Sequence, residues 1–143
     1  MQLKIFIDKE HPEEVHIYAH ENKKIIDEIK QVLDSNAVDI IGYSQDESVC
    51  INLAEVYYFT AEDNKIYAVT ENERLKVKKR LYQLESLLPE NFVKINQSCI
   101  ANVKKIDRFK ADVYGSLSVI FKNSHRDYVS RRQIKAVKER LGL

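Results

Sequence analysis

The polar side chains of the segment ENFVKINQSCIANVKKIDRF, residues 90–109, are the best candidates for binding chemistry in this sequence. Its apolar residues recur at no constant period, so the segment fits neither a single strand nor a single helix. Between them stand hydrogen-bonding side chains and two adjacent cations, which are Asn96, Gln97, Ser98, Asn102, Lys104 and Lys105. The pattern indicates buried anchors at irregular spacing that hold polar groups outward.

Residues typical of catalysis or metal binding form no recognisable set. His16 and His20 have the helical spacing of a metal pair, but His16 lies in a predicted strand, and no cysteine or carboxylate at ligand spacing completes the site. No nucleophile elbow, P-loop or dinucleotide motif occurs, and with only 3 Gly a phosphate-binding loop is hard to build. Asp8 follows an N-terminal apolar segment, as a phosphoacceptor would, but a turn residue is the simpler interpretation. We therefore expect no enzyme, no metal site and no cofactor.

Cysteine usage and hydropathy indicate a cytoplasmic protein. Cys50 and Cys99 are too few for a disulfide framework, and we expect both to be reduced thiols, with no support for a redox role of Cys99. No apolar run approaches membrane-spanning length, and the first residues are too acidic for a signal peptide.

Charge is divided unevenly along the chain. Residues 1–74 carry 7 Lys and Arg against 16 Asp and Glu, whereas residues 75–143 carry 16 against 6. The second half, with its net charge of +10, is expected to meet a polyanion, although the two halves could equally pair with each other.

The N-terminal elements precede a long β-rich region. Apolar alternation predicts strands at 3–7 and 14–19, and helical spacing predicts a helix within 21–36. Residues 1–37 are therefore expected to form a strand–strand–helix unit. From residue 38 onward, short β-rich segments are separated by polar turns, which is typical of antiparallel sheets joined by hairpins.

Two more helices are predicted in this second region. One lies within 77–89, where four leucines share a face and Pro89 ends the helix. The other closes the chain, with Ser130 as candidate N-cap and Gly142 near its end.

The order of motifs in residues 38–143 is specific. EVYYF (55–59) precedes EDNKIYAVT, then LKVKKRLYQLESLLPENFVKINQS, IANVKKI, a hairpin around residues 122–123, and VSRR. This region closely resembles the LytTR-type DNA-binding domain of bacterial transcriptional regulators. The resemblance implies a mainly β (α+β) fold, an elongated sandwich of small antiparallel sheets with short helices. It also implies that loops, rather than a recognition helix, enter the major groove of DNA.

The resemblance also implies functional residues. Three match base-contacting positions of the family, namely Lys65, Gln97 and Arg132. Amides can bond base edges in pairs, and an arginine fork matches guanine. Contacts to the DNA backbone, or support of the loops, are expected from Asn96, Ser98, Asn102, Lys104, Lys105 and Arg131. The lysines would hold phosphates, and Asn102 more readily bonds backbone within its own turn. The arginine pair 131–132 could also be a solvated first turn of the last helix.

Thirty-seven residues are too few for the receiver domain that precedes many such domains, so the chain resembles the stand-alone LytTR regulators. Some of these act with a small membrane protein that restrains the regulator. Residues 1–37 would serve dimerisation or that contact, although the apolar stripe of the helix could equally pack on the sheet. The resulting hypothesis is a sequence-specific transcription regulator that binds double-stranded DNA, acting as a homodimer or pair at repeated half-sites.

Two alternatives remain open at this point. The basic half could dock an acidic protein without DNA, which makes the chain an interaction module. RNA binding would need exposed aromatic side chains for stacking, which Tyr57, Tyr58 and Phe59 could supply unless they pack in the core.

Overall fold

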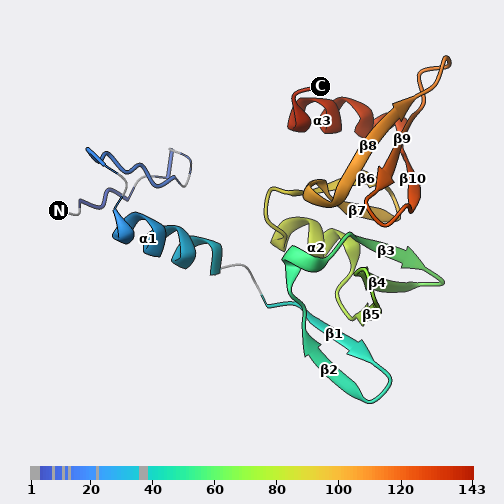
Figure 1. Cartoon of the computed structure of the whole chain (residues 1–143), viewed down its shortest axis with the longest axis horizontal. Coiled ribbons are helices and arrows are strands. Elements are labelled where there is room, and N and C mark those ends of the chain that lie inside the picture. The colour runs from blue at the N-terminus through green and yellow to red at the C-terminus, as the bar shows by residue number, and fades with distance from the viewer. Residues whose placement is uncertain (1–3, 8, 11, 13, 22, 36–38) are drawn as a thin grey trace. The chain divides into compact units, whose positions relative to one another are not determined.

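The computed structural model describes residues 4–7, 9–10, 12, 14–21, 23–35 and 39–143. The chain separates into two compact units, residues 1–36 and 37–143 (Figure 1). The first unit contains helix α1, Lys24–Ser35, which confirms the helix predicted within 21–36. On this helix apolar residues recur at the spacing that places them along one face, including Ile25, Ile29 and Leu33.

The two N-terminal strands were predicted wrongly, as far as the structure describes them. Residues 4–7 and 14–19 have no regular secondary structure, and Leu3 lies outside the described residues. Alternation of apolar residues gives a segment the capacity to form a strand, but a strand forms only where another strand pairs with it. Neither segment has such a partner within the described chain, and Phe6 and Tyr18 stay 85% and 92% exposed.

The second unit has the predicted architecture of antiparallel sheets with short helices. Its elements, in chain order, are β1 (Ile41–Ser44), β2 (Glu47–Cys50), the 3-10 helix η1 (Leu53–Glu55), β3 (Tyr58–Glu62), β4 (Lys65–Val69), β5 (Arg74–Val77), α2 (Leu81–Leu87), β6 (Phe92–Asn96), β7 (Cys99–Asn102), the 3-10 helix η2 (Val103–Lys105), β8 (Ile106–Ala111), β9 (Leu117–Phe121), β10 (Arg126–Val129) and α3 (Arg131–Leu141).

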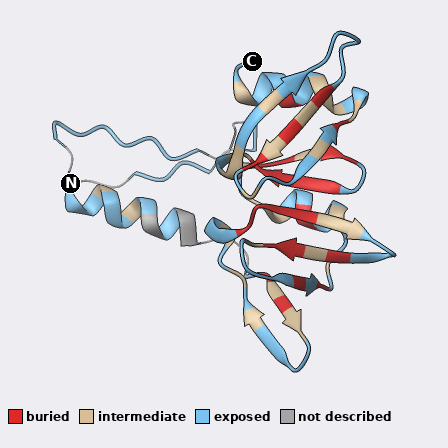
Figure 2. Cartoon of the chain, turned by 45° about the vertical axis from the view of Figure 1, so that its right-hand side comes forward, coloured by how far each residue is buried: buried red, intermediate tan, exposed pale blue. Residues whose placement is uncertain are grey.

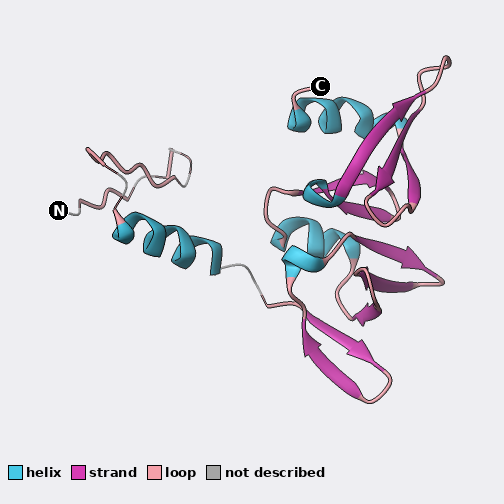
Figure 3. Ribbon diagram, in the orientation of Figure 1, coloured by secondary structure: helices cyan, strands magenta, loops and turns pink. Residues whose placement is uncertain are grey.

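Within the described residues the strands form two antiparallel sheets (Figure 3). The larger has the order β2-β1-β5-β4-β3-β7-β6, and the smaller has the order β10-β9-β8. Most neighbours in these sheets are consecutive in sequence, so tight hairpins make most of the connections. The larger sheet has two exceptions, β1 beside β5 and β3 beside β7. The second of these brings the turn after β3 close to the turn before β7.

The larger sheet is covered on both faces, because apolar side chains alternate along its central strands (Figure 2). Tyr58 faces one core, together with the smaller sheet and α3, while its neighbour Phe59 faces the other core, together with α2. Phe121 and Leu84 are the large side chains that the smaller sheet and α2 contribute to these two cores. Because side chains on both faces of β3 pack in a core, the strand and the turn that follows it have a fixed position.

The irregular spacing of residues 90–109 has a structural cause. Strand β6, a turn, strand β7, helix η2 and the start of β8 follow one another within this segment. The pairing of β6 with β7 also shifts register between Lys94 and Asn96, which breaks the alternation. Strand β8 was not predicted, because its sequence IDRFKA carries three charged residues among six.

Candidate nucleic-acid interface

The β3–β4 turn presents Lys65. Strands β3 and β4 pair Glu62 with Lys65 across a two-residue turn, and the turn residues Asp63 and Asn64 have φ angles of 49° and 61°. Two left-handed residues give the hairpin turn that matches the twist of its strands, and Asp and Asn adopt this conformation more readily than most residues. The turn is therefore short and well defined, and Lys65 is exposed at its end.

The buried side chain of Asn96 stabilises the β6–β7 turn. This side chain is 1% exposed, whereas the next two residues, Gln97 and Ser98, are exposed. The Asn96 Oδ1 atom accepts a hydrogen bond from the Ser98 amide at 2.9 Å. Its Nδ2 group donates to Asp127 Oδ1 at 3.0 Å and to the Tyr128 carbonyl at 2.9 Å. Asn96 thus supports the turn and ties it to β10, while Gln97 remains available to a partner.

Backbone hydrogen bonds bring the three predicted contact segments together. The Ala61 amide donates to the Ser98 carbonyl at 2.8 Å, which places the β3–β4 turn beside the β6–β7 turn. The Ser130 amide donates to the Ile95 carbonyl at 2.8 Å, which places the first turn of α3 beside the same hairpin. The turns that carry Lys65 and Gln97 and the start of α3 with Arg132 thus lie on one side of the unit (Figures 1 and 2). We call this side the loop end.

Both arginines at the start of α3 are exposed, and Ser130 occupies the N-cap position as predicted. Its side chain makes no capping hydrogen bond. Nothing in the described residues ties Arg131 or Arg132 to a carboxylate, so both guanidinium groups are free to bind an anion or a base edge.

Cys99 is the first residue of β7, next to the loop end, and its thiol is expected to be unreactive. It is fully buried, and this burial raises the pKa of its thiol. The negative charge of the nearby Asp127 carboxylate raises that pKa further. The thiolate is the reactive form of cysteine, so the structure gives no support to a redox role.

Asn102, Lys104 and Lys105 lie at the end of β7 that is away from the loop end. Asn102 is 1% exposed, and its Nδ2 group donates to the Val56 carbonyl at 2.7 Å. Its Oδ1 atom accepts from Asn91 Nδ2 at 2.9 Å and from the Lys104 amide at 3.1 Å. Since β7 begins beside Gln97 and ends at Asn102, Lys104 and the adjacent lysine are separated from the loop end by the length of the strand, about 13 Å.

The position of Asn102 agrees with the expectation that it bonds backbone within its own turn. It supports η2 from a buried position. Lys104 is exposed and Lys105 partly so, with its Nζ atom 5.2 Å from the centre of the Tyr57 ring, but neither joins Gln97 at the loop end. Strand β7 separates the two groups, and the expected contact of these lysines with DNA phosphates stays a prediction.

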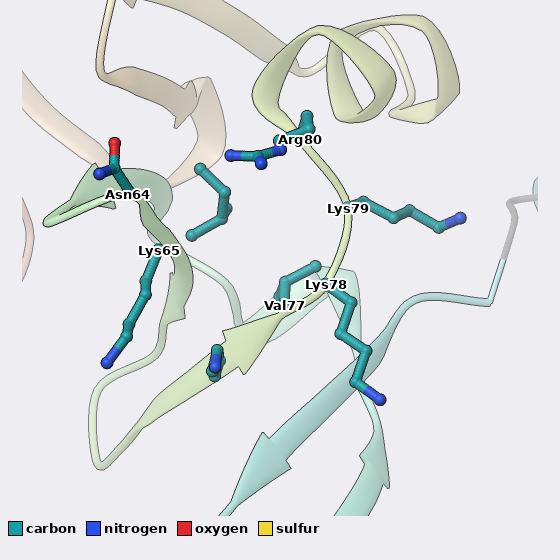
Figure 4. Close-up of a pocket in the computed structure, with 8 residues that line it drawn as sticks. Asn64, Lys65, Val77, Lys78, Lys79 and Arg80 are labelled. Atoms are coloured by element: carbon teal, nitrogen blue, oxygen red, sulfur yellow. The ribbon is translucent and has the colours of Figure 1, made fainter.

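A basic hollow lies beside Lys65 and was missed in the sequence. Strand β5 pairs Val77 with Ile66 of β4, so the residues after β5 emerge next to the β3–β4 turn. The cations that line the hollow are Lys65, Lys76, Lys78, Lys79 and Arg80 (Figure 4). In Figure 4 the Arg80 side chain extends across the hollow toward Asn64, while Lys79 points away from it.

The size and charge of this hollow suit a small anionic group. Its volume of about 240 Å³ is below the range of about 300–1,000 Å³ for sites that enclose a drug-sized ligand. Among the described residues, no carboxylate forms an ion pair with the five cations; the ion pair close by joins Arg74 to Glu62 at 2.7 Å. The three consecutive cations at 78–80 were the sequence signal, although a charge run is usually just a solvated face.

The aromatic run at residues 57–59, where β3 begins, offers no stacking surface. Tyr57, Tyr58 and Phe59 are at most 8% exposed and pack in the two cores. Single-stranded nucleic acid is bound by aromatic faces open to solvent, so these residues do not support RNA binding.

Within the described ranges, no group of three His, Cys, Asp or Glu side chains could hold a metal ion. No helix in that part of the chain is long and apolar enough to cross a membrane.

Comparison with known proteins gives one consistent result. The family described as the LytTr DNA-binding domain matches residues 46–142. Two uncharacterized HTH-type transcriptional regulators of Staphylococcus aureus, from strains MSSA476 and MW2, are each 33% identical to this chain over its whole length and over 99% of their own.

A solved structure shares the fold. The LytTr DNA-binding domain of a Bacillus cereus protein, described as a methyl-accepting/DNA response regulator, superposes with a TM-score of 0.70 at 25% identity. The match covers 74% of this chain and 99% of that one. The names of the S. aureus relatives refer to a helix-turn-helix, yet in the described part of this chain strands separate the helices from one another.

Proposed function

Since the chain belongs to the family of LytTr DNA-binding domains, we propose that it is a transcriptional regulator that recognises duplex DNA through turn tips. The observation that carries this proposal is the loop end. Three exposed side chains from distant parts of the sequence, Lys65, Gln97 and Arg132, project from segments that hydrogen bonds hold side by side. A scaffold that fixes backbone tips in this way can present side chains to the major groove without a recognition helix.

The chemistry of the tips divides into two roles. The Gln97 amide can bond an adenine edge in a pair, and the Arg132 guanidinium matches the O6 and N7 atoms of guanine. The basic hollow fits backbone phosphates, which set position but carry no sequence information. This second role makes the affinity depend steeply on salt, because phosphate contacts release counterions.

The proposal includes two copies bound at repeated half-sites and joined through their N-terminal units. Two segments of the N-terminal unit, 4–7 and 14–19, have no strand partner in the described chain. They carry hydrophobic side chains that are more than 60% exposed, namely Ile5, Phe6, Ile7, Val15 and Tyr18. Phe6 and Tyr18 would bury about 150–250 Å² each. With the aliphatic residues, the set reaches roughly the 800 Å² per partner of a standard interface. A second copy could supply the missing strands, since identical edges pair readily.

Sedimentation of the full chain tests the pairing. We expect a dimer that Phe6→Ser and Tyr18→Ser together convert to a monomer with an unchanged far-UV spectrum for the second unit. A wild-type monomer at all concentrations would refute pairing and leave the small membrane protein implied by the family resemblance as the occupant of this surface.

Selection of bound fragments from a random DNA pool, followed by anisotropy titration, tests the DNA proposal itself. We expect a defined motif and an affinity that falls by orders of magnitude as salt rises from about 50 to 200 mM. Binding without base preference, together with tight binding to an acidic protein, would instead show that the chain is an interaction module.

A further inference from the structure

The tip of the β8–β9 hairpin is rigid although it is a loop. The Asp112 Oδ1 atom accepts hydrogen bonds from the Tyr114 and Ser116 amides, both at 2.9 Å. The Asp112 amide donates to the Ser116 carbonyl at 3.0 Å, and Gly115 has a φ angle of 83°, which glycine adopts without strain. The side chains at this tip are therefore held on a defined backbone.

Two of those side chains are hydrophobic and lie outside both cores. Val113 is 92% exposed and Tyr114 is 90% exposed, and neither belongs to a core cluster. Polar residues are the usual choice at a hairpin tip, because nothing there is buried. A valine and a tyrosine side by side on a rigid tip instead fit a surface that is covered by a partner.

The strand register places this tip at the loop end. Leu117 of β9 is paired with Ala111 of β8 on one side and with Val129 of β10 on the other. The residue after Val129 is Ser130, whose amide bonds the Ile95 carbonyl and precedes α3. The hairpin therefore continues past the point where Arg132 projects, and Figures 1 and 2 both show the tip on the side of the β3–β4 turn.

We propose that Val113 and Tyr114 contact the DNA duplex on its flank beyond Arg132, an inference that rests on the proposed function. Tyr114 is three residues beyond Leu117, which is paired with Val129, so it reaches at most about 10 Å past that pair. That reach equals about three base pairs at about 3.4 Å each. The tyrosine ring and the valine methyl groups pack against sugars and base edges, where apolar side chains can contact the methyl group of thymine.

Charge favours DNA over a protein as the partner of this tip. Lys110, just before the end of β8, is exposed and has no ion pair with a described carboxylate. Its position fits a phosphate next to the groove that Tyr114 touches. The tip also shares its side of the unit with the basic hollow and with both exposed arginines of α3.

Binding of the full-length chain to two duplexes tests this contact. The long duplex carries the selected motif with about six base pairs beyond the edge that Arg132 reaches, and the short duplex ends at that edge, located by interference footprinting. We expect Tyr114→Ala to weaken binding about fivefold or more on the long duplex and not at all on the short one. The matched variant Tyr114→Phe keeps the ring and should bind both duplexes like wild type.

The outcomes separate this inference from the proposed function. Equal affinities of wild type and Tyr114→Ala on the long duplex, with Arg132→Ala still weakened, would overturn the tip contact and leave the proposed function standing. Loss of affinity on both duplexes would also overturn it, because the effect would not come from the flank. A failure of Arg132→Ala to weaken binding would count against the reading of DNA at the loop end.

Discussion

Replacing Asn96 with alanine should lower both the stability of the second unit and its affinity for specific DNA. The side chain is 1% exposed and makes three hydrogen bonds, to Ser98, Asp127 and Tyr128. At a net contribution of about 1 kcal/mol each, with groups left unpaired, the loss of unfolding free energy is about 2–4 kcal/mol. Affinity falls because the Gln97 turn is no longer tied to the strand that leads to Arg132.

Asn102→Ala is a matched control at the other end of β7. Asn102 has the same 1% exposure and also makes three side-chain hydrogen bonds, to Val56, Asn91 and Lys104. Its loss should lower the unfolding free energy by a similar amount. Because its partners lie away from the loop end, the affinity of the folded protein for specific DNA should change less than twofold.

Urea unfolding followed by circular dichroism measures the stability of both variants, and a common m-value shows that the native states are equally compact. Anisotropy titration at a temperature at which both variants are folded measures affinity. Equal losses of affinity in the two variants would refute the reasoning, since general loosening of the sheet would then explain them. Unchanged stability of Asn96→Ala would refute the role of its hydrogen bonds.

Three further predictions concern recognition and stability. Arg132→Ala should lower the free energy of binding to the selected site by about 1–3 kcal/mol and relax preference at one base pair, which binding to a set of single-base variants would reveal. Arg80→Ala should weaken binding to every sequence and reduce the slope of log affinity against log salt by about 1. Lys104→Ala, at the other end of β7, should reduce that slope less than Arg80→Ala does; the opposite ranking in salt titrations would count against the basic hollow. Burial raises the pKa of the Cys99 thiol above its ordinary 9.0 and that of the Tyr58 phenol above 10.0. The unfolded chain therefore releases these protons at lower pH than the folded chain does. The contribution of the two groups to the free energy of unfolding is complete below about pH 9 and decreases as the pH rises above it. Cys99→Ala should reduce this decrease, which urea unfolding at several pH values would measure.

Much of the fold was predictable because local patterns and the tertiary structure agree. Alternation along β3 and β4, the Asp63–Asn64 turn and the glycine at the end of α3 each specify their element locally. Strand β8 could not be found in this way, because its pairing with β9 comes from tertiary context rather than from its charged sequence. The strands predicted in the N-terminal segments did not form, since alternation of apolar residues needs a strand partner that the described residues do not supply.

The candidate site was predictable in its tips but not in its support. Gln97 and Arg132 are placed by motif, and the structure brings their segments together through hydrogen bonds of Asn96 and Ser130 that no spacing in the sequence reveals. The separation of Lys104 from Gln97 could not be predicted, because distance along the chain does not show which end of a strand a residue reaches. The basic hollow was missed because its cations come from two strands and from the residues before α2.

The position of Gln97 directly above Asn96 has an evolutionary consequence. Exposed residues away from caps and cores can usually be exchanged within about 0.5 kcal/mol, whereas buried hydrogen-bonding partners cannot. Gln97 can thus drift to other polar residues while the asparagine below it preserves the turn. If the turns read bases as proposed, lineages that inherit this scaffold can change their DNA targets through one exposed turn residue at a time without loss of the fold.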